Sequence, residues 1–218
     1  MIIDWLKEKT YKYRLLKAIK TYNSKNEDKM VMVQNVATFQ KMRGENNSII
    51  IGDGFIAYSP KFVILGNNNI IRLGNNVILG PGVSFVIQGN NCHITVGCKT
   101  TMTHSVEILV QEDEMFIEIG ENCMLSNTIN IRTSDSHPIY SQDSNSRINP
   151  PKPVIIEDNV WVAPNTKIMK GSRIGFGSII GTYTIVNKTI PCNCLAVGMP
   201  AKVVKEGVRW SREKMFEC

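Results

Sequence analysis

The sequence predicts an all-β fold, a parallel β-helix, and a six-residue periodicity is the first observation that indicates it. An aliphatic residue returns at every sixth position, namely Ile156, Val162, Ile168, Ile174, Ile180 and Val186. Helices repeat every 3.6 residues and strands every 2, so neither accounts for a period of six. Three hexads close one triangular coil, in which each periodic side chain points inward and stacks on its equivalents in the neighbouring coils.

A longer repeat nearer the N-terminus is the second observation. A template of aliphatic residues, glycine and a polar turn starts at Ile49, Ile71, Ile94 and Ile117, and a variant of it starts at Val154. Successive starts differ by 22, 23, 23 and 37 residues, whereas three hexads amount to about 18. We therefore expect four or five extra residues at one corner of each early coil, and 19 in the last interval. The segments 66–69, 74–76 and 89–91 suit such corners, because Gly and Asn tolerate positive φ.

Residues 1–48 are predicted to precede the β-helix as an amphipathic helix over 1–22 and a polar connector with a short strand near 30–36. Apolar residues such as Trp5 and Leu16 line one side of the helix, and residues 1–20 carry six basic side chains against Asp4 and Glu8. We favour packing of the apolar side against the column or a partner subunit. Weak docking on a membrane surface is the alternative. No aromatic or arginine-rich platform accompanies the charge, which disfavours nucleic-acid binding.

The β-helix itself is expected over residues 49–202, followed by a short C-terminal tail of strand or helix over 203–218. The surplus residues of the last interval fall at about 132–153, in a polar segment with prolines and no six-residue period. Long loops that leave a regular solenoid are commonly functional. We therefore expect this segment to protrude from the column and to carry the chemistry.

The composition is that of an ordinary globular protein, with 218 residues, 43% hydrophobic and 20% charged residues, and a formal net charge of +6. No apolar run reaches the roughly 20 residues of a membrane span, and charges at Asp4, Lys7 and Glu8 interrupt any signal-peptide core. A cytoplasmic location is therefore expected. The six cysteines lack the spacing of a zinc motif, so we expect them to be reduced, small and buried.

Of the three histidines, His93 and His104 lie within the repeats and are expected to be structural, whereas His137 lies in the surplus loop. Asp135 precedes His137, and Pro138 limits the backbone after it. A carboxylate that accepts a hydrogen bond from one ring nitrogen leaves the other nitrogen basic. The pattern favours His137 as a general base toward a hydroxyl, with Asp135 as its partner.

Two motifs in this region resemble those of a known family, the hexapeptide-repeat acyltransferases. Ser134-Asp-Ser-His-Pro-Ile-Tyr140 and Asn159-Val-Trp-Val-Ala-Pro164 are similar to signatures of its O-acetyltransferases. The nearest resemblance is to enzymes that modify surface polysaccharides of the polysialic-acid type, with galactoside and maltose acetyltransferases next. It is strongest over about 119–205, and the templates extend it back to about 49. It implies a left-handed coil, against the usual right-handed crossover, and a homotrimer with acetyl-CoA in each groove between columns.

The resemblance also implies roles for individual residues. His137 matches the base that takes the proton of the acceptor hydroxyl, and Trp161 matches the tryptophan that lines the acetyl or acceptor site. Backbone N–H groups near Ala163 would hold the thioester oxygen. Gly181 would let pantetheine pass close to the backbone, and Lys202 would meet the phosphates as a point charge. The implied acetyl-CoA-binding residues are Ala163, Pro164, Gly181, Thr182, Asn187, Lys188, Lys202 and Lys205. No metal is implied.

The resemblance favours a hydroxyl of a sugar or surface polysaccharide, of the capsule, O-antigen or sialic acid type, as the acceptor. Small acceptors such as galactosides, amino sugars and xenobiotics stay open. The residues placed to frame the acceptor are Tyr140, Arg132, Arg147, Met115 and His104.

Two other uses of such a column match the sequence less well. A zinc carbonic anhydrase needs three converging histidines, and His93, His104 and His137 share no hexad position. A non-catalytic assembly module would keep its repeats unbroken, whereas this chain interrupts them around a histidine.

Overall fold

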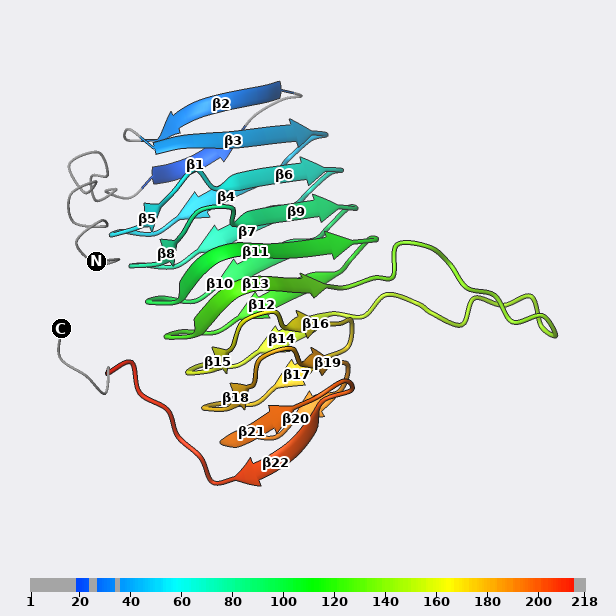
Figure 1. Ribbon diagram of the computed structural model, residues 1–218. Coiled ribbons are helices and arrows are strands. Elements are labelled where there is room, and N and C mark those ends of the chain that lie inside the picture. Colours follow the sequence, from blue (N-terminus) through cyan, green and yellow to red (C-terminus); the bar gives the residue numbers. More distant parts are fainter. Residues whose placement is uncertain (1–18, 24–26, 34–35, 214–218) are drawn as a thin grey trace.

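The computed structural model describes residues 19–23, 27–33 and 36–213, and every regular element in these ranges is a β-strand. The strands stack into a column of coils with a long loop projecting from its middle (Figure 1). Strands of successive coils lie side by side and parallel, and the template starts Ile71, Ile94, Ile117 and Val154 lie opposite one another. The prediction of an all-β parallel β-helix is confirmed.

The column has three faces, which the chain visits in turn. The first face consists of β4 (Ser48–Ile51), β7 (Ile70–Leu73), β10 (His93–Val96), β12 (Phe116–Ile119), β14 (Val154–Ile156), β17 (Arg173–Ile174) and β20 (Thr189–Ile190). The second consists of β5 (Ile56–Ala57), β8 (Ile78–Leu79), β15 (Trp161–Val162), β18 (Ile179–Ile180) and β21 (Cys194–Val197). The third consists of β3 (Val36–Arg43), β6 (Lys61–Leu65), β9 (Ser84–Gln88), β16 (Lys167–Ile168) and β19 (Ile185–Val186). β11 (Thr101–Gln111) and β13 (Met124–Arg132) run through both the second and the third face.

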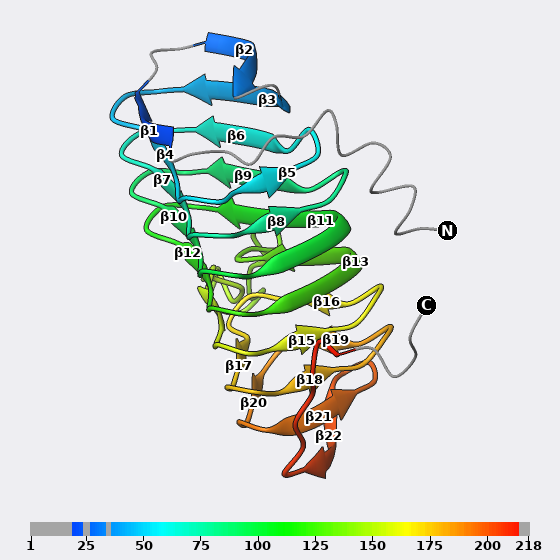
Figure 2. The same ribbon diagram turned by 90° about the vertical axis from the view of Figure 1, so that its left-hand side faces the viewer.

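The coils wind in the left-handed sense that the resemblance implies. In Figure 1 the near strands β6, β9 and β11 run from left to right, the far strands β7 and β10 run from right to left, and the chain descends from coil to coil. Figure 2 shows the same column with the left-hand side of Figure 1, where the second-face strands β5, β8, β15 and β18 lie, toward the viewer.

Inward side chains fill the column. The hexad positions from Ile156 to Val186 are at most 1% exposed, and burying one such aliphatic side chain contributes about 1.5–3 kcal/mol. Larger side chains fill the coils above the loop, where Phe62 and Phe85 are fully buried with ring centroids 5.3 Å apart. The core is therefore continuous along the column but bulkier above the loop than below it.

The cysteines of the described residues are all free, as the sequence predicts, but only some are buried. Cys92, Cys123 and Cys194 are buried, whereas Cys98 is half-buried and Cys192 is exposed. Burial raises the pKa of the Cys123 thiol to about 11, so this thiol stays protonated and acts as a small core side chain.

All the extra residues of the longer coils fall at one corner, as predicted. In a coil above the loop, Arg72, Ile78 and Ser84 occupy equivalent positions on the three faces at hexad spacing, but the next equivalent position is Thr95, nearly two hexads further on. In the coil directly below the loop, the equivalent positions Ile155, Trp161, Lys167 and Arg173 keep hexad spacing all the way round.

The protruding loop is an enlargement of this same corner. In the coil that carries it, Glu118, Met124 and Asn130 follow one another at hexad spacing, and the next equivalent position is Ile155, on the far side of the loop. The insertions thus all lie where the chain leaves the third face for the first.

Asparagines stabilise the turns at the corners of the coils above the loop. Asn68, Asn76 and Asn91 have positive φ angles of 58°, 58° and 56°, as the sequence predicts. The amide of Asn46 donates to that of Asn68, which donates to that of Asn91, each at 3.1 Å. These hydrogen bonds between stacked side chains link one coil to the next at the corners, where no strands pair.

The N-terminal prediction needs correction. Residues 1–18 lie outside the described residues, but 19–23, the end of the predicted helix, form strand β1 (Ile19–Asn23). β1 pairs antiparallel with β4, and β2 (Glu27–Val33) pairs antiparallel with β3. β3 already pairs parallel with β6, so the ladder begins before residue 49. These strands cover the sheet edge at the top of the column, and leaving such an edge uncovered is unfavourable. The amphipathic pattern of a segment carries no information about a distant sheet edge, so it predicted a helix instead.

The C-terminal tail begins with a strand, β22 (Lys202–Glu206), which pairs antiparallel with β21. Residues 207–213 then run along the left side of the column, back toward the earlier coils (Figure 1). Within the described residues, no helix is long and apolar enough to pass through a bilayer.

Candidate active site at the protruding loop

The loop between β13 and β14 is tied to the column at its neck. Thr133 is fully buried, and its hydroxyl accepts a hydrogen bond from the backbone N–H of Gln111 at 2.9 Å and donates to the Gln111 carbonyl at 3.0 Å. Lys152, at the other end of the loop, donates its backbone N–H to the Thr133 carbonyl at 3.0 Å. The loop therefore leaves and re-enters the column at one fixed point.

An ion pair joins the loop to the coil beneath it. The Lys170 ammonium lies 2.6 Å from Oδ2 of Asp135, and the Asn149 side chain donates to the same oxygen at 2.9 Å. The hydrogen bonds from Lys170 and Asn149 lower the pKa of the Asp135 carboxyl below its ordinary value. Asp135 is therefore an ionised anchor of the loop.

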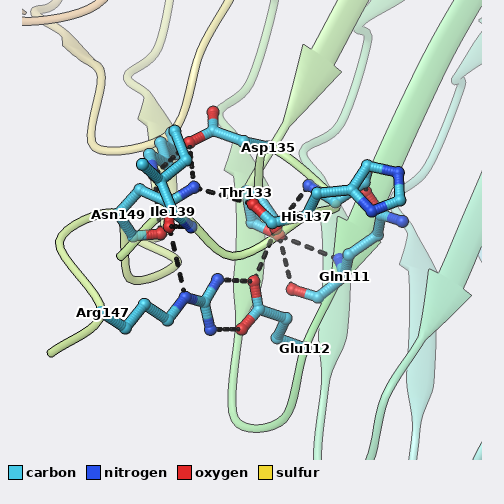
Figure 3. A network of polar contacts seen from close by, with 11 residues as sticks. Gln111, Glu112, Thr133, Asp135, His137, Ile139, Arg147 and Asn149 are labelled. Atoms are coloured by element: carbon cyan, nitrogen blue, oxygen red, sulfur yellow. Dashed lines mark hydrogen bonds and ion pairs between the residues drawn. The ribbon is translucent and has the colours of Figure 1, made fainter. Parts of the chain in front are cut away.

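A second ion pair joins the loop to the coil above it. Arg147 forms two parallel hydrogen bonds with the Glu112 carboxylate, one of them 2.7 Å from Nη2 to Oε1 (Figure 3). The Ser134 hydroxyl donates to Oε1 as well, at 2.6 Å. Arg147 holds the pKa of Glu112 below its ordinary value. The sequence suggested Arg147 as one of the residues that frame the acceptor, and two of its N–H groups bind Glu112.

His137 lies beyond these anchors, and its side chain is exposed. Asp135 does not hold the imidazole as the sequence predicted; the hydrogen bonds that its Oδ2 accepts come from Lys170 and Asn149. In Figure 3 the His137 ring points away from Asp135. The two residues are linked only through Asn149, whose side chain also donates to the backbone oxygen of His137 at 2.9 Å. The ring nitrogens of His137 have no partner within the described residues, which leaves them open to a substrate.

The other two histidines lie elsewhere. The His93 ring stacks on Phe116 on the first face, with centroids 4.9 Å apart, and lies 3.5 Å from Glu118. His104 is exposed in β11 beside Ser105. Among the residues that the structure describes, no three potential ligands gather to hold a metal ion.

Trp161 lies in β15 on the second face, and its indole N–H donates to the Ser126 hydroxyl at 3.4 Å. In Figure 1 β15 is on the left of the column, whereas the loop that carries His137 leaves on the right. The predicted base and the predicted tryptophan therefore do not meet within one chain.

The C-terminal tail packs against Trp161, which the sequence did not predict. The Trp210 ring lies 6.2 Å from the Trp161 ring, and its indole N–H donates to the Asn159 carbonyl. The Arg212 guanidinium lies 5.6 Å from the Trp210 ring centroid and donates to the Cys123 carbonyl at 2.7 Å. The only sequence signal was the pair Trp210 and Arg212 in an otherwise aperiodic tail.

Four of the expected acetyl-CoA-binding residues meet at the corner between the second and third faces. The Thr182 hydroxyl donates to the Pro164 carbonyl at 2.8 Å. The N–H of Ala163 donates to the Ile180 carbonyl at 2.8 Å within the column, so this amide is not available for a thioester oxygen. A side chain at Gly181 would lie 2.6 Å from Val197, so the coil itself requires glycine there. Packing thus accounts for the glycine at 181, and the Ala163 N–H belongs to the hydrogen bonds between coils.

The remaining expected acetyl-CoA-binding residues lie on the surface. Asn187, Lys188, Lys202 and Lys205 are exposed, the last two on β22. Asn187 lines a hollow of about 590 Å³ beneath the loop, together with Asp135, Asn149, Lys170 and Ile185. A second hollow of about 320 Å³ is lined by Thr128, Asn165, Lys167, Tyr183, Ile185 and Met199. The two hollows share Ile185, so they flank the third face of the coils below the loop.

Comparison with known proteins identifies this architecture. The crystal structure of the polysialic-acid-specific acetyltransferase NeuO superposes with a TM-score of 0.74 and 34% identity, over 82% of this chain and 76% of that one. The chain belongs to the hexapeptide-repeat acyltransferase family that contains this enzyme. A second member of this acyltransferase family, the polysialic acid O-acetyltransferase OatWY, matches with 31% identity and a TM-score of 0.65, over 80% of this chain and 92% of that one.

A curated acyltransferase of Escherichia coli O1:K1, a polysialic acid O-acetyltransferase, is 40% identical over 87 residues. These residues are 40% of this chain and only 28% of that relative's length. No protein-family model matches the chain.

Proposed function

We propose that the chain is an acetyl-CoA-dependent O-acetyltransferase that acts on a hydroxyl of a sugar or surface polysaccharide. The observation that carries the proposal is His137, an exposed imidazole on a loop that is pinned to the column at its neck and by two ion pairs. A fixed base with open ring nitrogens suits the removal of a proton from a bound hydroxyl. The names of the similar enzymes, which act on polysialic acid, support this acceptor class.

In the proposed reaction, the acceptor oxygen attacks the thioester carbonyl carbon while its proton passes to a ring nitrogen of His137. The resulting tetrahedral intermediate collapses, the carbon–sulfur bond breaks, and the imidazolium returns the proton to the coenzyme A thiolate. Asp135 takes part as a structural anchor rather than as a partner of the ring, because its Oδ2 binds Lys170 and Asn149 and the ring points away from it.

The site would be completed by a second chain. β15, which bears Trp161, and the loop that bears His137 lie on different sides of one column (Figure 1), so a site that uses both residues requires neighbouring columns. A closed ring of identical contacts, as in a homotrimer, would place the loop of each chain beside the second face of the next. Trp161 and Trp210 would then form an aromatic wall opposite His137.

The acetyl-CoA would lie along the third face below the loop. The two hollows flank this face; Asn187 lines the first, and Tyr183, the neighbour of Thr182 in the chain, lines the second. Lys188, Lys202 and Lys205 are exposed and would meet the phosphates as point charges. Because acetyl-CoA is cytoplasmic, we assign the reaction to the cytoplasm.

An amine acceptor is the second candidate. A tetrahydropyridine-dicarboxylate N-acetyltransferase of Staphylococcus aureus is 43% identical over 61 residues, which are 26% of that relative. A segment this short covers little more than the coils, so we rank this candidate below the sugar hydroxyl.

The test is a panel of acceptors incubated with acetyl-CoA and analysed by mass spectrometry. Sialic acid oligomers, neutral oligosaccharides and galactosides are compared with amino sugars and small amines. We expect a mass gain of one acetyl group on a saccharide, in an ester that mild alkali removes. Alkali-stable products formed only on amines would contradict O-acetyl transfer.

A further inference from the structure

Asn149 is the one loop residue between Ser136 and Pro150 that is buried, with 8% of its surface exposed. A polar side chain is costly to bury unless its hydrogen-bonding groups are satisfied. All four positions of the Asn149 amide have partners, two donated bonds and two accepted ones, so this residue is the polar centre of the loop.

The partners fix which way the amide points. Its nitrogen donates to Oδ2 of Asp135 and to the backbone oxygen of His137, each at 2.9 Å. Its oxygen accepts from the backbone N–H of Ile139 at 2.6 Å and from Nε of Arg147 at 3.4 Å. If the amide were rotated by 180°, its oxygen would face the oxygens of Asp135 and His137, and its N–H groups would face the N–H groups of Ile139 and Arg147. Only the observed orientation is therefore stable.

Two of these contacts clamp the segment that bears the proposed base. Asn149 binds the carbonyl of His137 and the N–H of Ile139, which lie on either side of Pro138. Proline has no N–H and a fixed φ angle. One amide side chain therefore holds both backbone groups that flank the proline and sets the direction in which residue 137 leaves the loop (Figure 3).

The clamp is itself fixed to the column on both sides. Asp135 is held by Lys170, from the coil below, and Arg147 is held by Glu112, from the coil above. Lys170 also donates to the backbone oxygen of Asn149 at 3.0 Å. Two ion pairs of the rigid coils thus converge on a single amide.

We propose that Asn149 is a positioning residue for acyl transfer, which fixes the backbone of His137 so that the imidazole meets the acceptor hydroxyl in one geometry. The inference rests on the proposed function of His137 and adds the residue that orients it. Small displacements of a catalytic group are costly, since a shift of about 1 Å can slow a reaction by about 100-fold.

The test is Asn149→Asp, which keeps the shape of the side chain but replaces both donated bonds with repulsion between oxygens. With acetyl-CoA and a sialic acid oligomer as substrates, we expect kcat to fall by about 10- to 100-fold while the KM for acetyl-CoA stays within about threefold. Asn145→Asp is the matched control, because Asn145 is exposed in the same loop and is expected to keep wild-type kinetics.

A double variant separates the contact with His137 from the contact with Asp135. Asp135→Asn, Asn149→Asp restores a donor opposite the new carboxylate but leaves the repulsion between this carboxylate and the His137 carbonyl, so we expect kcat to stay within about threefold of that of Asn149→Asp alone. Recovery to the wild-type kcat would mean that the contact with His137 does not position the base, and would overturn the proposal. His137→Ala is measured in parallel. An Asn149→Asp enzyme with at least half the wild-type kcat, beside an inactive His137→Ala, would overturn the role of Asn149 and leave the base in place. Full activity of His137→Ala would overturn both.

Discussion

The coils above the protruding loop and the coils below it share one inward periodicity but differ at a single corner. One hexad connects the first face to the second in both regions, and the second to the third everywhere except between Ile56 and Lys61, which are five residues apart. The step from the third face back to the first is nearly two hexads above the loop, as from Ser84 to Thr95. Below the loop it is one hexad from Lys167 to Arg173, and four residues in the next coil, from Ile185 to Thr189. The loop occupies this same corner at the boundary between the two regions, between Asn130 and Ile155.

This difference distinguishes the inward positions, which form the core of the column, from the one corner at which the length of the chain can change. The inward positions are buried in both regions, so a change of length at the corner leaves the stacking of the core intact. The coils with extra corner residues stop at the loop, and the hollow beneath the loop lies beside the shorter coils that follow. A rigid column with one variable corner is well suited to hold a reactive side chain in a fixed place.

The largest expected effect comes from removing the loop imidazole. We expect His137→Ala to lower kcat by about 10²–10⁴-fold, with little change in the KM for acetyl-CoA or in the melting temperature. Steady-state kinetics and thermal unfolding measure this. His93→Ala, which removes an imidazole from the first face of the column, should keep most of the activity. More than about a tenth of the wild-type kcat in His137→Ala would argue against a general base.

The next largest effect concerns the core on either side of the loop. We expect Phe85→Ala, above the loop, to lower the free energy of unfolding by about 3–5 kcal/mol, and Ile168→Ala, below it, by about 2–5 kcal/mol, because both leave cavities. Urea unfolding provides the measurement. Ile78→Ala is the control, since Ile78 is 40% exposed and should cost less than about 1 kcal/mol. Equal losses in all three would mean that inward and outward positions are not distinct.

The sequence predicted the column because its periodicity is local and redundant. Each inward residue from Ile156 to Val186 repeats the same information, and Asn68, Asn76 and Asn91 mark corners through their tolerance of positive φ. Register then follows from stacking equivalent positions. The N-terminal strands were missed because their pairing with β4 and β6 depends on a sheet edge that no local pattern reveals.

The position of the loop and its histidine could be predicted, but the contacts that hold them could not. Lys170 and Asp135 are 35 residues apart, as are Arg147 and Glu112, and none of the four carries a periodic signal. The expected pairing of Asp135 with His137 came from sequence proximity, and a lysine from the next coil competes for that carboxylate. Gly181 shows the same difficulty, since its glycine is explained by Val197 of the neighbouring coil.

The smallest expected effect is the response of the loop to acid. The pKa of Asp135 is lowered mainly by Lys170, and that of Glu112 mainly by Arg147. A lowered folded-state pKa means that both pairs stabilise the loop fully above the ordinary values of 3.8 and 4.5, and that this contribution is lost as pH falls through the lowered values. We therefore expect the loop to lose protection below about pH 4, before the coils open.

Hydrogen exchange, corrected for the intrinsic effect of pH, measures this difference. Peptides over 133–152 should exchange a few-fold faster at about pH 3 than at pH 5, while peptides of β16 and β19 change little. Lys170→Ala should show part of this loss already at pH 5. Unchanged loop protection in acid would mean that the two ion pairs do not hold the loop.

The proposed site is assembled from two chains, and subunit mixing tests this directly. We expect His137→Ala and Trp161→Ala chains to be inactive when each is prepared alone. When the two are unfolded and refolded together in equal amounts, roughly a quarter of the sites should combine an intact His137 from one chain with an intact Trp161 from its neighbour. We predict recovery of about that share of wild-type activity. A refolded mixture no more active than either variant alone would contradict a site shared between columns.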